Sequence, residues 1–392
     1  MNIPQGYKQT ELGIIPEDWK VVNFCEVADN FTGLTYAPEN VKNYGTLVLR
    51  SSNIQDGFLC YEDNVYVDGI NIPDRAKAKA GDILVCVRNG SRNLIGKSAL
   101  ISSKAPKNLA FGAFMTVLRA KNGSHNIFIH QIWQSDYIQR QIKDNLGATI
   151  NQVTNKDISR YIIPMPPIAE QRAIAEALSD VDGLIAALDK KIAKKRLLKQ
   201  GAMQQLLTGK TRLPGFTDEW VEKKLGEISS VYQPLTISQE CFTIDGYNVY
   251  GANGIIGKYE LYNHTTDQVM VTCRGSSCGT VNMSKGYCWI TGNAMVINMD
   301  KYDIDKTFVY YCLLNQDLSE LITGSGQPQI VRAPLIEFAI KMPQSTNEQQ
   351  TIATILSDMD KEIADLEAQR DKYRLLKLGM MQKLLTGQIR LK

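Results

Sequence analysis

The sequence predicts an α+β protein in which two mixed α/β globular domains are separated by two long helices packed as a coiled coil. Three observations support this prediction: a long internal repeat, short alternating apolar runs before each copy of the repeat, and a helical apolar stripe inside each copy. Fixed-period self-similarity indicates repeated structural units, so we expect a pseudo-two-fold internal repeat.

The internal repeat is the clearest feature of the chain. Residues 170–209 align without a gap with residues 348–387. Both copies open with Glu-Gln, continue through Leu-Ser-Asp and Leu-Leu-Lys, and end in Leu-Leu-Thr-Gly. We therefore divide the chain into a first globular domain, a central helical spacer, a second globular domain and a C-terminal helical spacer, at residues 1–165, 166–209, 210–343 and 344–392.

The repeated segments are predicted to be helices that pair with each other. Apolar residues recur three and four positions apart, which is typical of a two-helix coiled coil. Gly209 and Gly387 are placed as left-handed C-terminal caps, and Ser345 with Glu348 as a capping box at the second helix. The seam residues are Leu178, Val181, Ile185, Leu188 and Ile192 in the first copy, and Leu356, Met359, Ile363 and Leu366 in the second.

Each globular domain is predicted to mix strands and helices. Residues 44–49 and 81–87 are short apolar runs bounded by turn residues, which is typical of strands. Residues 128–134 and their counterpart 308–314 are more typical of helix. The two domains differ in length, because 151 positions separate Trp19 from Glu170 but only 128 separate Trp220 from Glu348.

Composition excludes several classes of protein. Lys and Arg number 44 and Asp and Glu 41, so a positive field for nucleic acid must be local. The eight cysteines form no CxxC pair and only three histidines occur, which favours reduced thiols over a zinc site. The absence of an apolar leader or a long apolar run predicts a cytoplasmic protein with no membrane association.

No motif of a catalytic site or cofactor site is convincing. The chain lacks the Asn-Pro-Pro-aromatic motif of amino-methyltransferases, a GxGxxG after a strand, HExxH and GxSxG. Residues 90–98 resemble a phosphate-binding P-loop, but five residues separate the glycines where that motif needs four. We therefore expect no catalytic residue, no metal and no cofactor on this chain.

Polar residues at strand ends and in Gly-rich turns are the candidate DNA contacts. Arg can bond guanine in a bidentate manner, Asn or Gln can do so with adenine, and Ser can donate to phosphate. Similar sets recur in both halves, although each position alone is also typical of an ordinary polar loop. The first-half candidates are Arg50, Ser51, Ser52, Asn53, Arg88, Asn89, Ser91, Arg92, Asn93, Asn151 and Gln152. The second-half candidates are Tyr250, Asn253, Arg274, Ser276, Ser277, Gln327 and Gln329.

A lysine-rich run follows the seam of the first helix. It comprises Lys190, Lys191, Lys194, Lys195, Arg196 and Lys199. Two interpretations stay open for it: a solvated helix face, or a contact with the DNA backbone or a partner.

Several motifs resemble type I restriction-modification specificity subunits. The opening at residues 6–19, the proline-rich entry to the first helix, the Glu-Gln-x-x-Ile-Ala segments at 170–175 and 348–353, and the helices ending in Leu-Leu-Thr-Gly are similar to that family. The resemblance covers the whole chain, but the globular domains resemble the family in layout only.

The resemblance implies a non-catalytic subunit of a complex with an adenine methyltransferase and an ATP-dependent endonuclease. Residues 1–165 and 210–343 would be two target recognition domains, each reading one half of an asymmetric bipartite site in double-stranded DNA. The two helices would lie antiparallel and set the gap. The implied partners are two methyltransferase subunits and two restriction subunits. S-adenosylmethionine, ATP and magnesium would then be bound by those partners.

Three alternatives stay open. The chain could be a scaffold of two protein-binding domains that never touches DNA, which the near-neutral charge favours. It could contain a nuclease centre, although Pro73-Asp74 is the only superficial start of such a motif. It could also serve a system that only modifies DNA.

Overall fold

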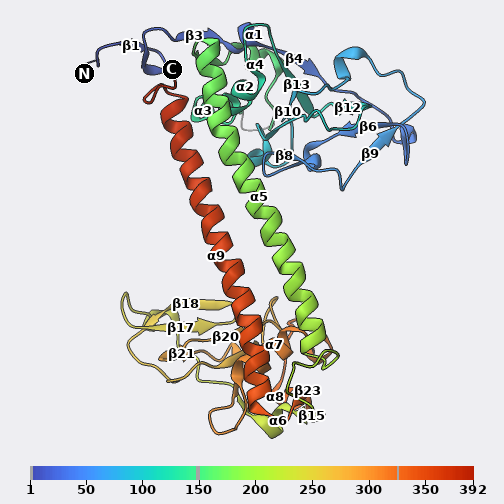
Figure 1. Cartoon of the computed structure of the whole chain (residues 1–392), viewed down its shortest axis with the longest axis vertical. Coiled ribbons are helices and arrows are strands. Elements are labelled where there is room, and N and C mark those ends of the chain that lie inside the picture. Colours follow the sequence, from blue (N-terminus) through green and yellow to red (C-terminus); the bar gives the residue numbers. More distant parts are fainter. Residues whose placement is uncertain (1–2, 147–150, 325) are drawn as a thin grey trace. The chain divides into compact units, whose positions relative to one another are not determined.

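The computed structural model describes residues 3–146, 151–324 and 326–392. The chain forms two compact units, one of Met1–Ala187 with Arg370–Lys392 and one of Leu188–Gln369. Each unit holds one globular domain together with a segment of each long helix, α5 (Ile168–Leu206) and α9 (Thr346–Leu384) (Figure 1). The compact units divide inside the helices, so the boundaries of the four predicted segments stay a prediction.

The domain of the first unit contains two four-stranded sheets. One has the order β11-β10-β13-β4 and the other β12-β6-β9-β5. Their strands are β4 (Ala28–Thr32), β5 (Val41–Lys42), β6 (Thr46–Leu49), β9 (Val65–Val67), β10 (Ile83–Cys86), β11 (Ser98–Leu100), β12 (Leu109–Phe111) and β13 (Met115–Ala120). Strand pairs complete the unit: β1 (Tyr7–Thr10) with β2 (Gly13–Pro16), β3 (Lys20–Asn23) with β14 (Ile162–Met165), and β7 (Ile54–Gln55) with β8 (Phe58–Leu59). The short helices are α1 (Phe24–Val27), α2 (Asn126–Trp133), α3 (Asp136–Asn145) and α4 (Asn155–Arg160).

The domain of the second unit repeats this plan with fewer strands. Its four-stranded sheet has the order β16-β22-β19-β20, and a three-stranded sheet has the order β18-β17-β21. The strands are β16 (Ser230–Tyr232), β17 (Tyr247–Gly251), β18 (Gly254–Tyr259), β19 (Val269–Thr272), β20 (Val281–Met283), β21 (Cys288–Ile290) and β22 (Ala294–Asn298). The pair β15 (Trp220–Lys224) with β23 (Ala339–Pro343) corresponds to β3 with β14, and the helices are α6 (Leu225–Ile228), α7 (Lys306–Leu314) and α8 (Arg332–Glu337).

The structure confirms the predicted fold class and internal repeat. The central antiparallel pair β10–β13 corresponds to β19–β22, and the parallel pair β6–β12 corresponds to β17–β21. The predicted strands at 44–49 and 81–87 are β6 and β10, and the predicted helices at 128–134 and 308–314 are α2 and α7. Among the described residues, no helix is both long enough and apolar enough to cross a membrane.

The ends of the long helices belong to the cores of the globular domains. Ile174 and Leu178 near the start of α5 share one core with Leu384 near the end of α9. In the second unit Leu356 of α9 shares a core with Leu206 of α5. Leu178 and Leu356 were predicted as seam positions, but each packs into a domain core because the first turns of each helix lie against a sheet-bearing domain. The other predicted seam residues that are buried lie farther from the helix starts. They are Ile185, Leu188, Ile192, Ile363 and Leu366.

Each unit contains a buried glutamate carboxylate that accepts hydrogen bonds from an arginine and a tryptophan of other segments. In the first, Arg390 Nε and Nη2 each donate over 2.7 Å to the carboxylate of Glu170, which also accepts from Trp19 Nε1 at 2.9 Å. Arg390 also pairs with Asp18 at 2.7 Å, and that arginine holds the pKa of the Asp18 carboxyl below its ordinary range. The segment after α9 is thereby attached to the start of α5.

The second unit contains an equivalent arrangement. We call Trp19–Glu170–Arg390 and Trp220–Glu348–Arg212 the two clamps. Arg212 Nε and Nη2 donate to Glu348 over 2.9 Å, and Trp220 Nε1 donates over 3.4 Å. The predicted capping box of Ser345 and Glu348 stays a prediction, and both oxygens of the buried Glu348 carboxylate accept from Arg212. The predicted glycine caps are confirmed: Gly209 and Gly387 have φ of 68° and 71°, the left-handed conformation that suits glycine.

Replacing Arg390 with alanine should destabilise the first unit by about 3–5 kcal/mol, because it leaves the Glu170 carboxylate buried without its cation. Urea unfolding followed by tryptophan fluorescence measures this loss. Arg140→Ala is the matched control, since Arg140 forms only an exposed ion pair within α3 and should change stability by less than about 1 kcal/mol. Equal losses in both variants would contradict a specific role for the clamp.

His130 makes the stability of the first unit pH-dependent. Burial, with a smaller contribution from the charge of Lys377, lowers the pKa of His130 from 6.5 to about 4. The unfolded chain therefore binds more protons than the folded chain between these two values. The contribution of neutral His130 to the free energy of unfolding is fully present above pH 6.5. It should fall by about 3 kcal/mol as the pH drops toward 4.

Hydrogen exchange of the α2 amides, corrected for intrinsic rates, measures this dependence. His130→Gln should flatten the profile between pH 6.5 and 4. A slope that is unchanged in His130→Gln would show that other groups cause it.

Candidate nucleic-acid interface

The structure joins two candidates that the sequence placed 64 positions apart, Arg88 and Gln152. Arg88 follows the buried strand β10 and forms an antiparallel bridge with Gln152, and both side chains are exposed. Neighbouring bonds hold the two segments together: Asn89 N donates to Asn151 O at 3.3 Å, and Asn151 Nδ2 donates to Gly90 O at 3.0 Å. We call Arg88 and Gln152 the first strand-end pair.

Three further residues, Ser51, Lys97 and Phe114, lie beside the first strand-end pair or its neighbour Asn89. Asn89 Nδ2 donates to Ser51 Oγ at 3.2 Å, and Lys97 Nζ donates to Ser51 O at 3.4 Å. The Arg88 guanidinium lies 5.0 Å from the ring centroid of Phe114, which is 57% exposed. Lys97 and Phe114 were not among the sequence candidates, because neither has a recognisable counterpart in the repeat.

The second unit contains an equivalent pair, which we call the second strand-end pair. Arg274 follows β19 and forms an antiparallel bridge with Gln329, and both side chains are exposed. Gly275 N donates to Pro328 O at 3.2 Å, as Asn89 does to Asn151 in the first unit. Arg332, which sequence reasoning missed, lines a hollow of about 180 Å³ with Arg274 and Gln329. Its position at the start of α8 is the only signal that could have pointed to it.

Two candidates contribute to the fold rather than to the surface. Asn53 is fully buried, and its Oδ1 accepts from Arg50 N at 2.8 Å while its Nδ2 donates to Cys60 O at 3.0 Å. Tyr250 is 7% exposed and packs in a core with Ile290. These contacts give both residues structural roles, and their predicted contact with DNA stays a prediction.

The other candidates lie at or near the surface. Arg50 forms an ion pair with Asp63 at 2.9 Å that solvent reaches, so its guanidinium could exchange this partner for a phosphate. Arg92 Nη2 donates to Leu146 O at 3.3 Å. Exposed side chains belong to Ser52, Ser91, Arg92, Asn93, Asn253, Ser276 and Gln327, and half-buried ones to Ser51, Asn89, Asn151 and Ser277. Of the two predicted Gly-rich turns, residues 147–150 and 325 lie outside the described residues.

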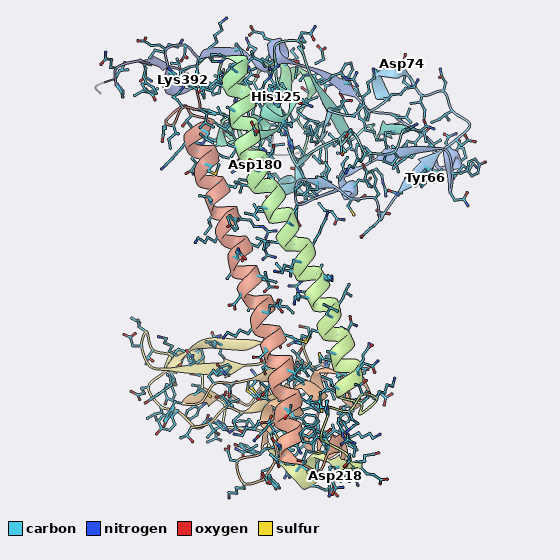
Figure 2. All side chains as sticks on the ribbon, viewed as in Figure 1. Tyr66, Asp74, His125, Asp180, Asp218 and Lys392 are labelled. Atoms are coloured by element: carbon cyan, nitrogen blue, oxygen red, sulfur yellow. The ribbon has the colours of Figure 1, made fainter. Side chains whose placement is uncertain are left out.

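Both strand-end pairs present exposed polar side chains. Within residues 3–146, 151–324 and 326–392, no three His, Cys, Asp or Glu side chains gather so that they could hold a metal ion. The strand-end pairs offer hydrogen-bond donors and acceptors where two segments meet at the end of a strand (side chains of the chain are drawn in Figure 2). The fold and these pairs define a protein with two equivalent recognition units.

The comparisons identify the family. A model described as the type I restriction modification DNA specificity domain matches residues 16–195 and 217–373. The chain therefore belongs to the family of type I restriction-modification specificity subunits, whose members are non-catalytic and recognise DNA. This confirms the resemblance derived from the sequence motifs.

Relatives and solved structures support the assignment over the whole length. The chain is 26% identical to a putative type I restriction enzyme MjaX specificity subunit of Methanocaldococcus jannaschii, over 99% of this chain and 97% of that protein. It is 30% identical to the EcoKI specificity subunit of Escherichia coli, over 53% of this chain and 45% of that one. A crystal structure of the specificity subunit from M. genitalium shares the fold with a TM-score of 0.67 at 19% identity, covering 98% of each chain. A structure from a study of the assembly of a type I system has a TM-score of 0.56 at 17% identity, covering 96% of this chain and 99% of that one.

Asn53→Ala should destabilise the first unit by about 1–3 kcal/mol without changing the DNA sequence recognised, because it removes buried hydrogen bonds and no surface group. Urea unfolding gives the first quantity and methylation mapping the second. Ser52→Ala, at the exposed neighbouring position, is the control and should be close to neutral in stability. A changed recognition sequence in a stable Asn53→Ala protein would contradict this assignment.

Proposed function

We propose that each unit reads one half of an asymmetric, bipartite site in double-stranded DNA through its strand-end pair. The observation that carries the proposal is the recurrence of an exposed Arg–Gln bridge at the same strand end in both units. Arg suits guanine or a phosphate and Gln suits adenine, so such a pair can discriminate between bases.

The surroundings of the pairs support different targets for the two halves. Phe114 and Lys97 flank the first pair, whereas Arg332 flanks the second. Binding would draw affinity from contacts of Arg and Lys with phosphates and would therefore weaken as salt increases. Base contacts would add about 1–3 kcal/mol of discrimination for each base pair.

The helices would set the gap between the two halves and carry the partner subunits. The proposed complex holds two methyltransferase subunits and, where restriction occurs, two restriction subunits. S-adenosylmethionine, ATP and magnesium would be bound by these partners and not by this chain. The complex would work in the cytoplasm, where bacterial DNA is accessible.

The test is methylation mapping by long-read sequencing in a host without adenine methyltransferases, with this chain expressed beside a cognate methyltransferase. The unaltered chain should direct one motif of two short blocks around a fixed gap. Arg88→Ala should relax the sequence in one block by about 5–150-fold, equal to 1–3 kcal/mol, and Arg274→Ala should relax the other block. Arg140→Ala is the matched control and should leave both blocks unchanged.

Other outcomes would contradict the proposal. A contiguous motif would oppose two separate recognition units, and a single substitution that altered both blocks would oppose their independence. A stable complex with the methyltransferase that never binds DNA would favour the scaffold alternative.

A further inference from the structure

In each unit, an ion pair between the α5 segment and the α9 segment also contacts a side chain of the globular domain. In the first unit, Lys377 Nζ of α9 lies 2.7 Å from Asp182 Oδ1 of α5, and Gln131 Nε2 of α2 donates to Asp182 Oδ2 at 3.0 Å. The Lys377 and Asp182 side chains are 17% and 25% exposed, so solvent screens this pair only partly. Three elements therefore meet at one carboxylate.

The second unit builds the same cluster from the repeated positions. Lys199 Nζ of α5 lies 2.5 Å from Asp360 Oδ1 of α9, and the Tyr311 hydroxyl of α7 donates to Asp360 Oδ2 at 2.7 Å. Lys199 Nζ also lies 5.1 Å from the ring centroid of Tyr311. Asp360 and Lys377 each stand 178 positions after Asp182 and Lys199, so the internal repeat generates both clusters.

Other ion pairs between the helix segments lack a domain side chain. Lys195 pairs with Glu362 at 2.7 Å, and Arg196 pairs with Glu367. Among the contacts of the described residues, neither pair includes a side chain from α7 or a sheet. The lysine-rich run predicted as a solvated face or a DNA contact thus supplies three bonds to α9 through Lys195, Arg196 and Lys199.

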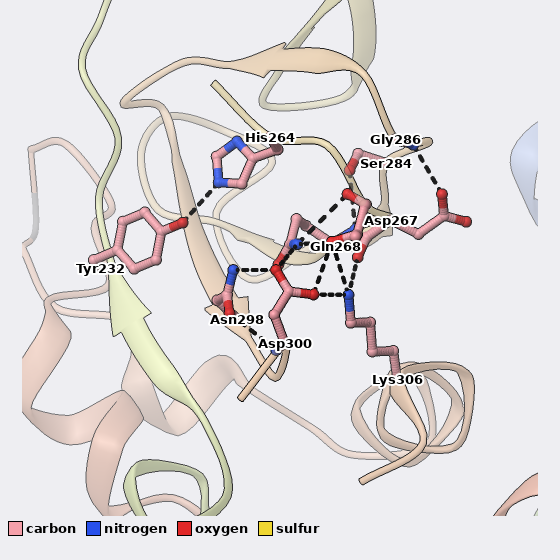
Figure 3. Close-up of polar contacts among 10 residues, drawn as sticks. Tyr232, His264, Asp267, Gln268, Ser284, Gly286, Asn298, Asp300 and Lys306 are labelled. Carbon is pink, nitrogen blue, oxygen red and sulfur yellow. Dashed lines mark hydrogen bonds and ion pairs between the residues drawn. The ribbon is translucent and has the colours of Figure 1, made fainter. Parts of the chain in front are cut away.

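A chain of polar contacts connects the second strand-end pair to α7. Gln268 immediately precedes the start of β19, and Arg274 lies two residues after its end. Gln268 Nε2 donates to Asp300 Oδ2 at 3.0 Å, and Lys306, the first residue of α7, pairs with Asp300 and donates to Asp267 O at 2.8 Å (Figure 3). Burial opposes ionisation of Asp300, but hydrogen bonds led by the one from Lys306 outweigh it and lower the pKa to about 2. The strand that carries Arg274 is thereby attached to the helix that carries Tyr311.

The first unit makes the same connection with different residues. Arg119 Nε and Nη2 each donate over 2.7 Å to the carboxylate of the buried Asp82, which immediately precedes β10. Asn126, the first residue of α2, donates to Gly81 O at 3.3 Å. The strand that carries the first strand-end pair is thus attached to the helix that carries Gln131.

We propose that Gln131–Asp182–Lys377 and Tyr311–Asp360–Lys199 are positioning clusters that fix the orientation of each strand-end pair on the helix segments of its own unit, and thereby restrict the gap between the two DNA blocks. This inference rests on the proposed function. Successive base pairs are 3.4 Å apart along the duplex, so a domain that tilts by a few ångströms at its strand end reaches the neighbouring register. A cluster that joins three elements at one carboxylate opposes such tilting more than an ion pair that joins two.

Tyr311→Phe is the sharpest test, because it removes the bond from the domain and leaves the Lys199–Asp360 pair in place. Methylation mapping should show the original motif together with motifs whose gap is one base pair longer or shorter. We expect the fraction of methylated sites with an altered gap to rise at least about tenfold, a change of about 1.4 kcal/mol in preference. Both block sequences should stay unchanged, because neither strand-end pair is altered.

Two further variants separate positioning from a general loss of stability. Asp360→Asn should broaden the gap in the same direction, and Lys199→Arg, which keeps the charge, should retain the original gap. Lys195→Met is the matched control, since it removes an ion pair between the helices that has no domain side chain, and it should leave the gap unchanged.

The outcomes distinguish this inference from the proposed function. A single unaltered gap in Tyr311→Phe, with or without reduced total methylation, would overturn the positioning role while leaving bipartite reading in place. Equal broadening in Lys195→Met would also overturn it, because helix pairing in general would then set the gap. A motif that is contiguous in the unaltered chain would contradict the proposed function itself.

Discussion

The carboxylates of Glu170 and Glu348 are the constraint on which the two units depend. Each is almost fully buried and accepts hydrogen bonds from an arginine beyond the end of one long helix and from a tryptophan that opens a domain. A buried ion pair adds little stability compared with apolar packing, but a buried charge that loses its partner is very costly. Sliding one helix along the other would separate each arginine from its carboxylate, so these contacts exclude wrong registers of the two helices more than they add to stability.

The two units share one framework but present different surfaces. Both domains place a buried central strand under an exposed Arg–Gln bridge, and both attach the other end of that strand to a helix. The residue before the strand differs between the units: Asp82 accepts from Arg119 of β13 in one, whereas Gln268 donates to Asp300 in the other. The framework therefore constrains geometry rather than residue identity, which leaves the flanking side chains free to differ.

Periodicity explains how much of this architecture the sequence predicted. The two long helices, their glycine caps and the strands β6 and β10 follow from local patterns that need no knowledge of tertiary contacts. The choice of Arg88, Gln152, Arg274 and Gln329 also came from the sequence, since turn residues recurred in both halves.

Contacts between distant segments could not be predicted in this way. The bridge between Arg88 and Gln152 joins two segments that have β11, β12, β13, α2 and α3 between them in the sequence, so it depends on how the whole domain folds. Glu348 fitted a capping box by spacing, yet Arg212 from another segment takes its carboxylate. Asn53 resembled a surface donor because local sequence does not reveal that a 3-10 turn at Ser51–Asn53 directs it inward.

The division of the chain between the units has a consequence for synthesis. The second unit is one continuous stretch, Leu188–Gln369, whereas the first unit needs Arg370–Lys392 to complete it. Because a ribosome makes the chain from its N-terminus, every residue of the second unit leaves the ribosome before the segment that completes the first. Until then Trp19 lacks the Arg390 guanidinium that lies 5.7 Å from its ring centroid, and the Glu170 carboxylate has no arginine beside it. The domain that is translated first is therefore the one that finishes folding last.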